Sequence, residues 1–183
     1  MAIKLWLKEL VYRLRGSYTV ERLTRMGLTV GKNFNPQLGF NLDPSHCWLI
    51  TIGDDVTFGP NVQILAHDAS MHQVLGYTKI GRVNIGNRVF IGAGSIVLPN
   101  VIIGDDVIVG AGSVVTKDIP AGKVFAGNPA KEICDTMDLL EKHRQGMEIR
   151  PVYGEDYTLR KDISEEKKAQ QKQQMADGVG YVI

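Results

Sequence analysis

This chain of 183 residues contains few cysteines and few aromatic residues, and its net charge is small. Only two cysteines occur, Cys47 and Cys134, far apart and without a CxxC motif, which argues against a disulfide-stapled scaffold or a cysteine-rich zinc site. The net charge is +1, so no nucleic-acid partner is indicated. The apolar runs are too short to span a bilayer, and no secretory leader is recognisable. We therefore expect one reduced, cytoplasmic protein without a metal, in which Cys47 is a structural thiol.

Glycine is abundant instead, and it recurs in a six-residue pattern from about Ile52 to Pro120. An aliphatic or aromatic residue leads each hexad, and glycine nearly always follows a leading residue in the first two hexads of a triple. The leading residues are Ile52, Phe58, Ile64, Ile85, Ile91, Val97, Ile103, Val109 and Val115. The hexads group in threes, each group beginning with IG-(D/N)-x-V, so a longer period of eighteen residues is superimposed on the period of six. Such a fixed short period predicts a parallel β-helix with three short strands per coil, whose leading residues stack inside.

From roughly Gly27 to Ile133 the pattern resembles the hexapeptide-repeat acyltransferases. The resemblance is strongest to the branch of maltose and galactoside O-acetyltransferases and of the O-acetyltransferases of bacterial surface polysaccharides. It implies a mainly β fold, a left-handed parallel β-helix shaped as a triangular prism, which assembles as a homotrimer with the active site between two subunits. The left-handed sense of the β-helix is implied by the family alone. The repeat itself does not indicate it, and parallel crossovers are generally right-handed. Acetyl-CoA is the implied acyl donor and a sugar or glycan the implied acceptor.

Both ends of the chain differ from the repeat. The expected segments are an N-terminal helical cap (1–26), the hexapeptide-repeat domain (27–132) and a C-terminal helical extension (133–183). Leucines and basic residues between Lys4 and Arg15 predict an amphipathic helix, and a second short helix is expected from a Ser17 cap to Gly27. We expect this cap to pack on the prism or on a neighbouring subunit. A peripheral membrane contact through the basic helix is the alternative.

The C-terminal extension is predicted to begin with a helix from Ile133 to Gln145. A loop follows, and Ser164 then caps a very polar segment, SEEKKAQQKQQM. We expect a solvated or partner-packed helix there and assign it no chemistry.

The repeat breaks once, between Ile64 and Ile85, where 21 residues replace six. An excursion of about Ser70 to Asn84 keeps the triples in phase, and long loops that interrupt a solenoid are commonly functional. We expect this loop to help shape the acceptor pocket. His67 stands just before it, at a corner where later coils carry asparagine and aspartate. From the residues alone, His67 is either a structural histidine or a group that takes a proton from an alcohol near neutral pH.

The family resemblance assigns site residues to the chain. It makes His67 the general base that deprotonates a sugar hydroxyl for direct attack on the thioester of acetyl-CoA. Three residues are candidates to orient His67 or to contact the acceptor, although each also suits an ordinary turn: Asn41, Asp43 and Asp68. Five residues are expected to bind the donor: Ala93, Ala111, Thr116, Lys117 and Lys131. A second basic residue of the donor site is replaced here by Cys134.

Other functions use the same scaffold. An N-acetyltransferase of an amino-sugar nucleotide or other small amine could use the same base. A zinc hydro-lyase of the γ-carbonic-anhydrase kind is suggested superficially by His67 and His72, but a catalytic zinc needs three protein ligands. Gly31 stands where the third histidine is needed, and His46 is out of phase. A catalytically silent scaffold is the remaining alternative.

Overall fold

The computed structural model describes residues 18–183, and the chain divides into two compact units, Met1–Thr136 and Met137–Ile183. The predicted amphipathic helix between Lys4 and Arg15 and the proposed Ser17 cap lie outside the described residues. The second expected helix is present as α2 (Val20–Arg25). It is capped by Thr19, whose hydroxyl accepts a hydrogen bond from the Arg22 N–H at 3.2 Å. Among residues 18–183, no helix is both long and apolar enough to cross a membrane.

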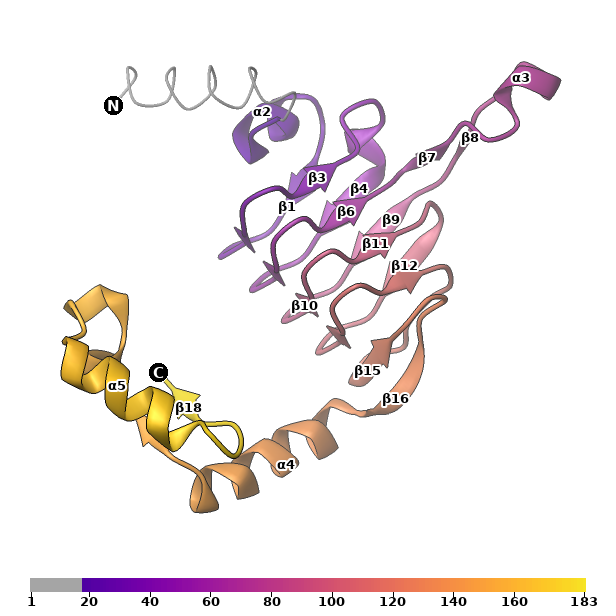
Figure 1. Cartoon of the computed structure of the whole chain (residues 1–183). Coiled ribbons are helices and arrows are strands. Elements are labelled where there is room, and N and C mark those ends of the chain that lie inside the picture. Colours follow the sequence, from indigo (N-terminus) through magenta and orange to yellow (C-terminus); the bar gives the residue numbers. More distant parts are fainter. Residues whose placement is uncertain (1–17) are drawn as a thin grey trace, which may run out of the picture. The chain divides into compact units, whose positions relative to one another are not determined.

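The first unit is a coil of very short strands that stack into three parallel sheets (Figure 1). The first sheet contains β1 (Thr29–Val30), β4 (Ile50–Ile52), β9 (Val83–Ile85) and β12 (Val101–Ile103). The second contains β2 (Asn35–Pro36), β5 (Thr57–Phe58), β10 (Phe90–Ile91), β13 (Ile108–Val109), β15 (Lys123–Ala126) and, antiparallel at its end, β16 (Lys131–Asp135). The third contains β3 (Asn41–Leu42), β6 (Gln63–Ile64), β11 (Ile96–Val97) and β14 (Val114–Val115). This architecture is mainly β and consistent with the expected left-handed β-helix.

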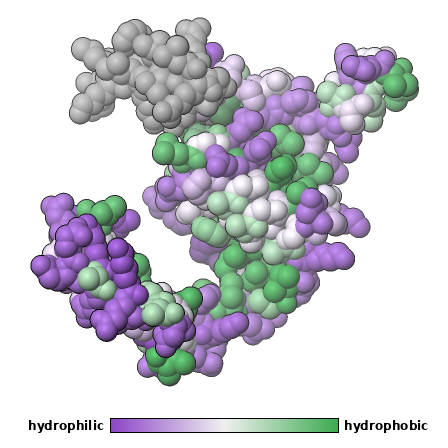
Figure 2. All heavy atoms as spheres, viewed as in Figure 1, coloured by the Kyte–Doolittle hydropathy of each residue, from purple (hydrophilic) through white to green (hydrophobic). Residues whose placement is uncertain are grey.

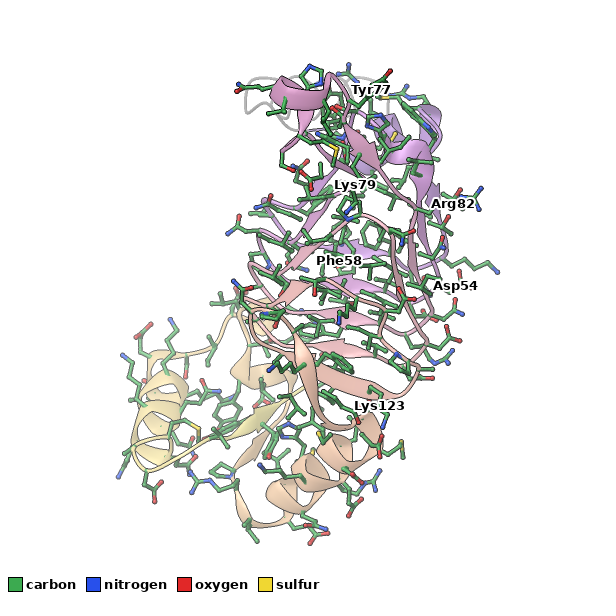
Figure 3. The ribbon with its side chains drawn as sticks, turned by 90° about the vertical axis from the view of Figure 1, so that its right-hand side faces the viewer. Asp54, Phe58, Tyr77, Lys79, Arg82 and Lys123 are labelled. Atoms are coloured by element: carbon green, nitrogen blue, oxygen red, sulfur yellow. The ribbon has the colours of Figure 1, made fainter. Side chains whose placement is uncertain are left out.

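The register of the strands follows the hexads. Ile52 pairs with Ile85, Ile91 with Val109 and Val97 with Val115. All nine leading residues are at most 3% exposed, and they form the core. Figure 3 shows one of them, Phe58, inside the prism, whereas Asp54 points outward. The inward stacking of the leading residues, expected from their period, is therefore what builds the hydrophobic interior.

The corner between the first and second sheets explains the third and fourth letters of the IG-(D/N)-x-V hexads. Side-chain oxygens at the third letter accept the backbone N–H of the preceding coil: Lys32 to Asp54 at 2.7 Å, Asp54 to Asn87 at 2.9 Å, and Asn87 to Asp105 at 2.8 Å. The last bond holds the pKa of Asp105 below its ordinary value. Residues at the fourth letter turn the chain with φ between 55° and 58°: Asp55, Arg88 and Asp106. Asparagine and aspartate tolerate this geometry best.

The corner between the third and first sheets is the irregular one. In the coils that contain β11 and β14 it is three residues long, 98–100 and 116–118. It expands to seven residues (43–49) after β3, where the 3₁₀ helix η1 (Cys47–Leu49) forms, and to eighteen (65–82) after β6. These two insertions lie on neighbouring coils, because β3 and β6 are paired strands.

The longer insertion is an arm that extends beyond the prism (Figure 1). Its stem is an antiparallel pair, β7 (His67–Asp68) and β8 (Lys79–Ile80), and α3 (His72–Leu75) lies at its tip. The expected excursion of 70–84 is therefore displaced, because the stem already pairs at His67 and the prism resumes at Val83. Figure 2 shows both hydrophilic and hydrophobic side chains at the arm's tip, where Val74 and Leu75 are exposed.

The chain leaves the prism through a hairpin rather than a helix. The predicted helix from Ile133 is wrong at its start, because Lys131–Asp135 pairs with β15 and α4 begins at Thr136 (Thr136–Ile149). Lys123 fixes this pair by ionic contacts with Glu132 and Asp135 at 2.8 and 2.7 Å. The second unit also contains β17 (Val152–Tyr153), η2 (Glu155–Tyr157), η3 (Leu159–Lys161), α5 (Glu165–Gln174) and β18 (Tyr181–Val182). Ser164 caps α5 as expected.

Candidate active site

The site is built where the two corner insertions meet. Asp43 directly follows β3, and its N–H donates to Ile64 O of the neighbouring β6 at 2.9 Å. His67 begins the stem of the arm, three residues after β6. Pairing of adjacent strands thus brings together two side chains that lie 24 residues apart in sequence.

Asp43 and His67 form a hydrogen-bonded pair. Asp43 Oδ2 lies 2.5 Å from His67 Nδ1, and the carboxylate is 1% exposed whereas the imidazole is 35% exposed. Two backbone groups also donate to this carboxylate, Ala66 N–H at 2.9 Å and Ser45 N–H at 3.1 Å. An ionised carboxylate only accepts hydrogen bonds, so Nδ1 carries a proton, and in the neutral imidazole Nε2 then keeps its lone pair. The buried carboxylate therefore orients a partly exposed imidazole.

The other two candidates for this role point elsewhere. Asp68 follows His67 directly, but its carboxylate accepts the Ser70 N–H at 2.9 Å, and this bond holds its pKa below the ordinary value. Asn41 lies on β3 with its side chain exposed on the outer face of the third sheet, beside Gln63. Of the three candidates, Asp43 is the one whose side chain is hydrogen-bonded to the imidazole of His67.

Sequence reasoning missed two residues of the shorter insertion, His46 and Trp48. The His46 ring lies 5.4 Å from the His67 ring and 5.3 Å from the Trp48 ring, measured between centroids. Trp48 is 55% exposed. His46 appeared out of phase because the corner after β3 carries four residues more than the regular corners. The signal in the sequence was the eight-residue interval from Leu42 to Ile50, where Val97 to Val101 is four.

Asp43, His46 and His67 are close enough together to be considered as metal ligands, because one potential ligand atom from each lies within 4.8 Å of the others. However, the Asp43 carboxylate already accepts hydrogen bonds from three donors, and one of them is His67 Nδ1. A metal bound by Asp43 would have to compete with these donors for the carboxylate oxygens. The donor set therefore suits a hydrogen-bonded acid–base pair better than a catalytic zinc, and His72 lies on the arm beside Thr78.

The residues expected to bind the donor lie along the two edges that flank the third sheet. Thr116 and Lys117 follow β14, on the same edge as His67 but two strands further along the stack. Ala93 and Ala111 follow β10 and β13 on the opposite edge of that sheet. Lys131 begins β16 opposite Ala126, beyond the corner that contains Ala111. Each of the five is exposed, and Cys134 is partly buried on β16.

Known proteins share this repeat. The family model described as bacterial transferase hexapeptide (six repeats) matches residues 82–117. Protein CapG of Staphylococcus aureus is 35% identical over 170 residues, which is 88% of this chain and 92% of CapG. The galactoside O-acetyltransferase of Escherichia coli (strain K12) is 34% identical over 161 residues, 86% of this chain and 70% of the relative.

Solved structures of acetyltransferases are also similar to this chain. A maltose O-acetyltransferase from Clostridium difficile 630 has a TM-score of 0.53 and 43% identity, over 60% of this chain and 59% of that one. A galactoside acetyltransferase in complex with coenzyme A has a TM-score of 0.53 and 34% identity, over 63% of this chain and 58% of that one. The chain belongs to the hexapeptide-repeat acetyltransferases, in the branch of the galactoside and maltose O-acetyltransferases, and the expectation of an acyltransferase is confirmed.

Proposed function

We propose that this protein transfers the acetyl group of acetyl-CoA to a sugar hydroxyl, with His67 as general base, in bacterial surface polysaccharide synthesis. The observation that carries the proposal is the 2.5 Å contact between buried Asp43 and half-buried His67. Relatives named for galactoside and maltose O-acetylation support a sugar hydroxyl as acceptor. A relative bound to coenzyme A supports the donor.

The proposed mechanism is a direct transfer. His67 Nε2 takes the proton of the acceptor hydroxyl as its oxygen attacks the thioester carbonyl. The Asp43 carboxylate, held by Ala66 N–H and Ser45 N–H, stabilises the imidazolium that forms. When the tetrahedral intermediate collapses, the carbon–sulfur bond breaks and His67 returns the proton to the departing thiolate of coenzyme A. No covalent acetyl-enzyme is required, and Cys47 is fully buried.

The donor is proposed to lie between two subunits of a homotrimer, each subunit being a left-handed β-helix. Its expected contacts occupy both edges of the third sheet, so one subunit need not supply them all. The edge with Thr116 and Lys117 would come from the subunit that supplies His67. The edge with Ala93, Ala111 and Lys131 would face it from the neighbour, where the lysine can neutralise phosphate.

The test is release of coenzyme A thiol from acetyl-CoA in the presence of sugars, polysaccharide repeat units and amino-sugar nucleotides, with His67→Ala alongside. We expect turnover with a hydroxyl acceptor, lost by at least about 10²-fold in the variant, and a product cleaved by mild base. A base-stable product would indicate the amide of an N-acetyltransferase instead. Turnover that survives in the variant would show that His67 is not the base.

A further inference from the structure

The aromatic rings of Trp48, His46 and His67 lie next to one another in that order. The two ring-to-ring steps, Trp48 to His46 at 5.3 Å and His46 to His67 at 5.4 Å, place all three on one corner of the prism. The planes are tilted by 51° and 45°, so the rings make a curved surface rather than a stack. We propose that Trp48 and His46 are the acceptor platform, on which the apolar face of a pyranoside lies with one hydroxyl directed at His67.

This inference rests on the proposed function and narrows it to ring-shaped sugars. A pyranoside has an apolar face of C–H groups and a rim of hydroxyls, so it matches an exposed indole beside a proton acceptor. The acceptor oxygen must approach His67 Nε2, and the Asp43 contact occupies the other ring nitrogen. The rings beside His67 are therefore the surface that the acceptor meets. A linear or very small acceptor would leave most of that surface uncovered.

The fold presents Trp48 rigidly although its side chain is exposed. Its neighbours in η1 are anchored, because Cys47 is fully buried and Leu49 packs against the core. Gly27 lies so close that a Cβ there would come within 2.8 Å of Trp48 Cβ. The Trp48 side chain therefore projects into solvent from an anchored segment of backbone, which suits a binding platform.

His46 carries an independent sign that this corner is not merely structural. Its Nδ1 atom is buried and has no hydrogen-bond partner among residues 18–183. Buried polar atoms are normally satisfied, and the exceptions often mark functional sites. The ring thus lies between Trp48 and His67 at the cost of a nitrogen that no described residue pairs.

The experiment measures steady-state kinetics of Trp48→Ala and Trp48→Phe with methyl β-D-galactopyranoside, methyl β-D-glucopyranoside and maltose, and with glycerol as a hydroxyl acceptor without a ring. Leu159→Ala is the matched control, because Leu159 is also a large exposed apolar residue but belongs to the second unit. We expect Trp48→Ala to raise the KM for the best pyranoside about tenfold, with kcat and the KM for acetyl-CoA little changed. Trp48→Phe should restore most of the affinity, and Leu159→Ala should match the wild type.

A second measurement reports binding directly. The chain has two tryptophans, so Trp6→Phe leaves Trp48 as the sole indole. We expect its emission to shift on addition of the pyranoside, and not on addition of glycerol. An unchanged emission together with an unchanged KM in Trp48→Ala would overturn the platform. A change of oligomeric state in Trp48→Ala would also overturn it, by showing that Trp48 is a subunit contact.

The outcomes separate this inference from the proposed function. Transfer to pyranosides that requires His67 but is unchanged in Trp48→Ala would reject the platform and leave the proposed function standing. Transfer to amines or to linear alcohols, with none to pyranosides, would reject the sugar acceptor and the platform together.

Discussion

In the proposed mechanism, Asp43 determines which nitrogen of His67 faces the acceptor, so the charge of Asp43 should matter more than its size. In Asp43→Asn the amide can either donate to or accept from Nδ1, and the preference for a protonated Nδ1 is lost. We expect kcat to fall by about 10²–10⁴-fold, with a nearly unchanged KM for acetyl-CoA. Steady-state kinetics measures this, and ¹⁵N chemical shifts of the imidazole report the tautomer.

Asp68→Asn is the matched control for that substitution. Asp68 is adjacent to His67, but its carboxylate accepts the Ser70 N–H at the start of the arm. Its kcat should stay near that of the wild type. Equal losses in both variants, or an unchanged tautomer in Asp43→Asn, would contradict the positioning role of Asp43.

The thiol of Cys47 should be inert in the folded protein. It is fully buried, its sulfur lies 3.7 Å from the carbonyls of Leu23 and Met26, and burial raises its pKa. A raised thiol pKa favours the protonated form, so this contribution to stability is present below the unfolded pKa and is lost as pH rises above it. At pH 8, we expect iodoacetamide to label Cys134 and to spare Cys47 until denaturant is added. Mass spectrometry of the peptides checks this, and equal labelling rates would refute it.

At the level of residues, the repeat was enough to predict where His67 lies in the fold. The phase of the hexads placed His67 at a corner, and the structure pairs it with one of its three candidate partners. The choice of Asp43 over Asn41 and Asp68 was out of reach, because it depends on how a seven-residue corner folds. That corner also hid Trp48, whose neighbours in sequence carry no recognisable motif.

Close stacking of coils makes some glycines irreplaceable, and Gly92 is a clear case. A Cβ at Gly92 would lie 2.8 Å from Ala111 Cα in the next coil, and backbone cannot yield as a side chain can. We expect Gly92→Ala to lower the free energy of unfolding by about 2–3 kcal/mol, measured by urea denaturation at fixed protein concentration.

Gly94→Ala separates crowding from backbone strain. Gly94 has φ +69°, and a Cβ there would meet nothing within 4 Å. The variant should lose only about 1–2 kcal/mol, the cost of a left-handed backbone with a side chain. A loss in Gly94→Ala as large as that in Gly92→Ala would show that contact between coils is not the limiting factor.

At the level of elements, regular coils were predictable and departures from them were not. Nine leading residues, six apart except at the one break after Ile64, specify strands, corners and core at once, because each coil repeats the same contacts. The exit from the prism has no repeat to follow, and Ile133 to Asp135 looks helical in isolation. The strand β15 offers this segment an open edge, and that tertiary pairing overrides local propensity.

At the scale of the whole molecule, the distribution of the expected donor residues over two edges argues for shared active sites. His67 lies on one edge of the third sheet and Ala111 on the other. In a cyclic trimer these edges can face each other across a subunit boundary. We expect light scattering to give three times the 20.2 kDa of the chain.

Mixing two inactive variants tests whether the sites are shared. His67→Ala removes the base, and Ala111→Trp should block the donor from the opposite edge. Each should be inactive alone and should keep the oligomeric state of the wild type. If the sites are shared, some subunit boundaries in a co-expressed 1:1 mixture combine an intact His67 edge with an intact Ala111 edge. Random assembly places both intact edges at about a quarter of the boundaries, so about a quarter of wild-type activity should return. If a single subunit supplied both residues, every site in the mixture would carry one lesion and no activity would return. Recovery by mixing therefore distinguishes a shared site from a self-contained one, whatever acceptor the enzyme uses.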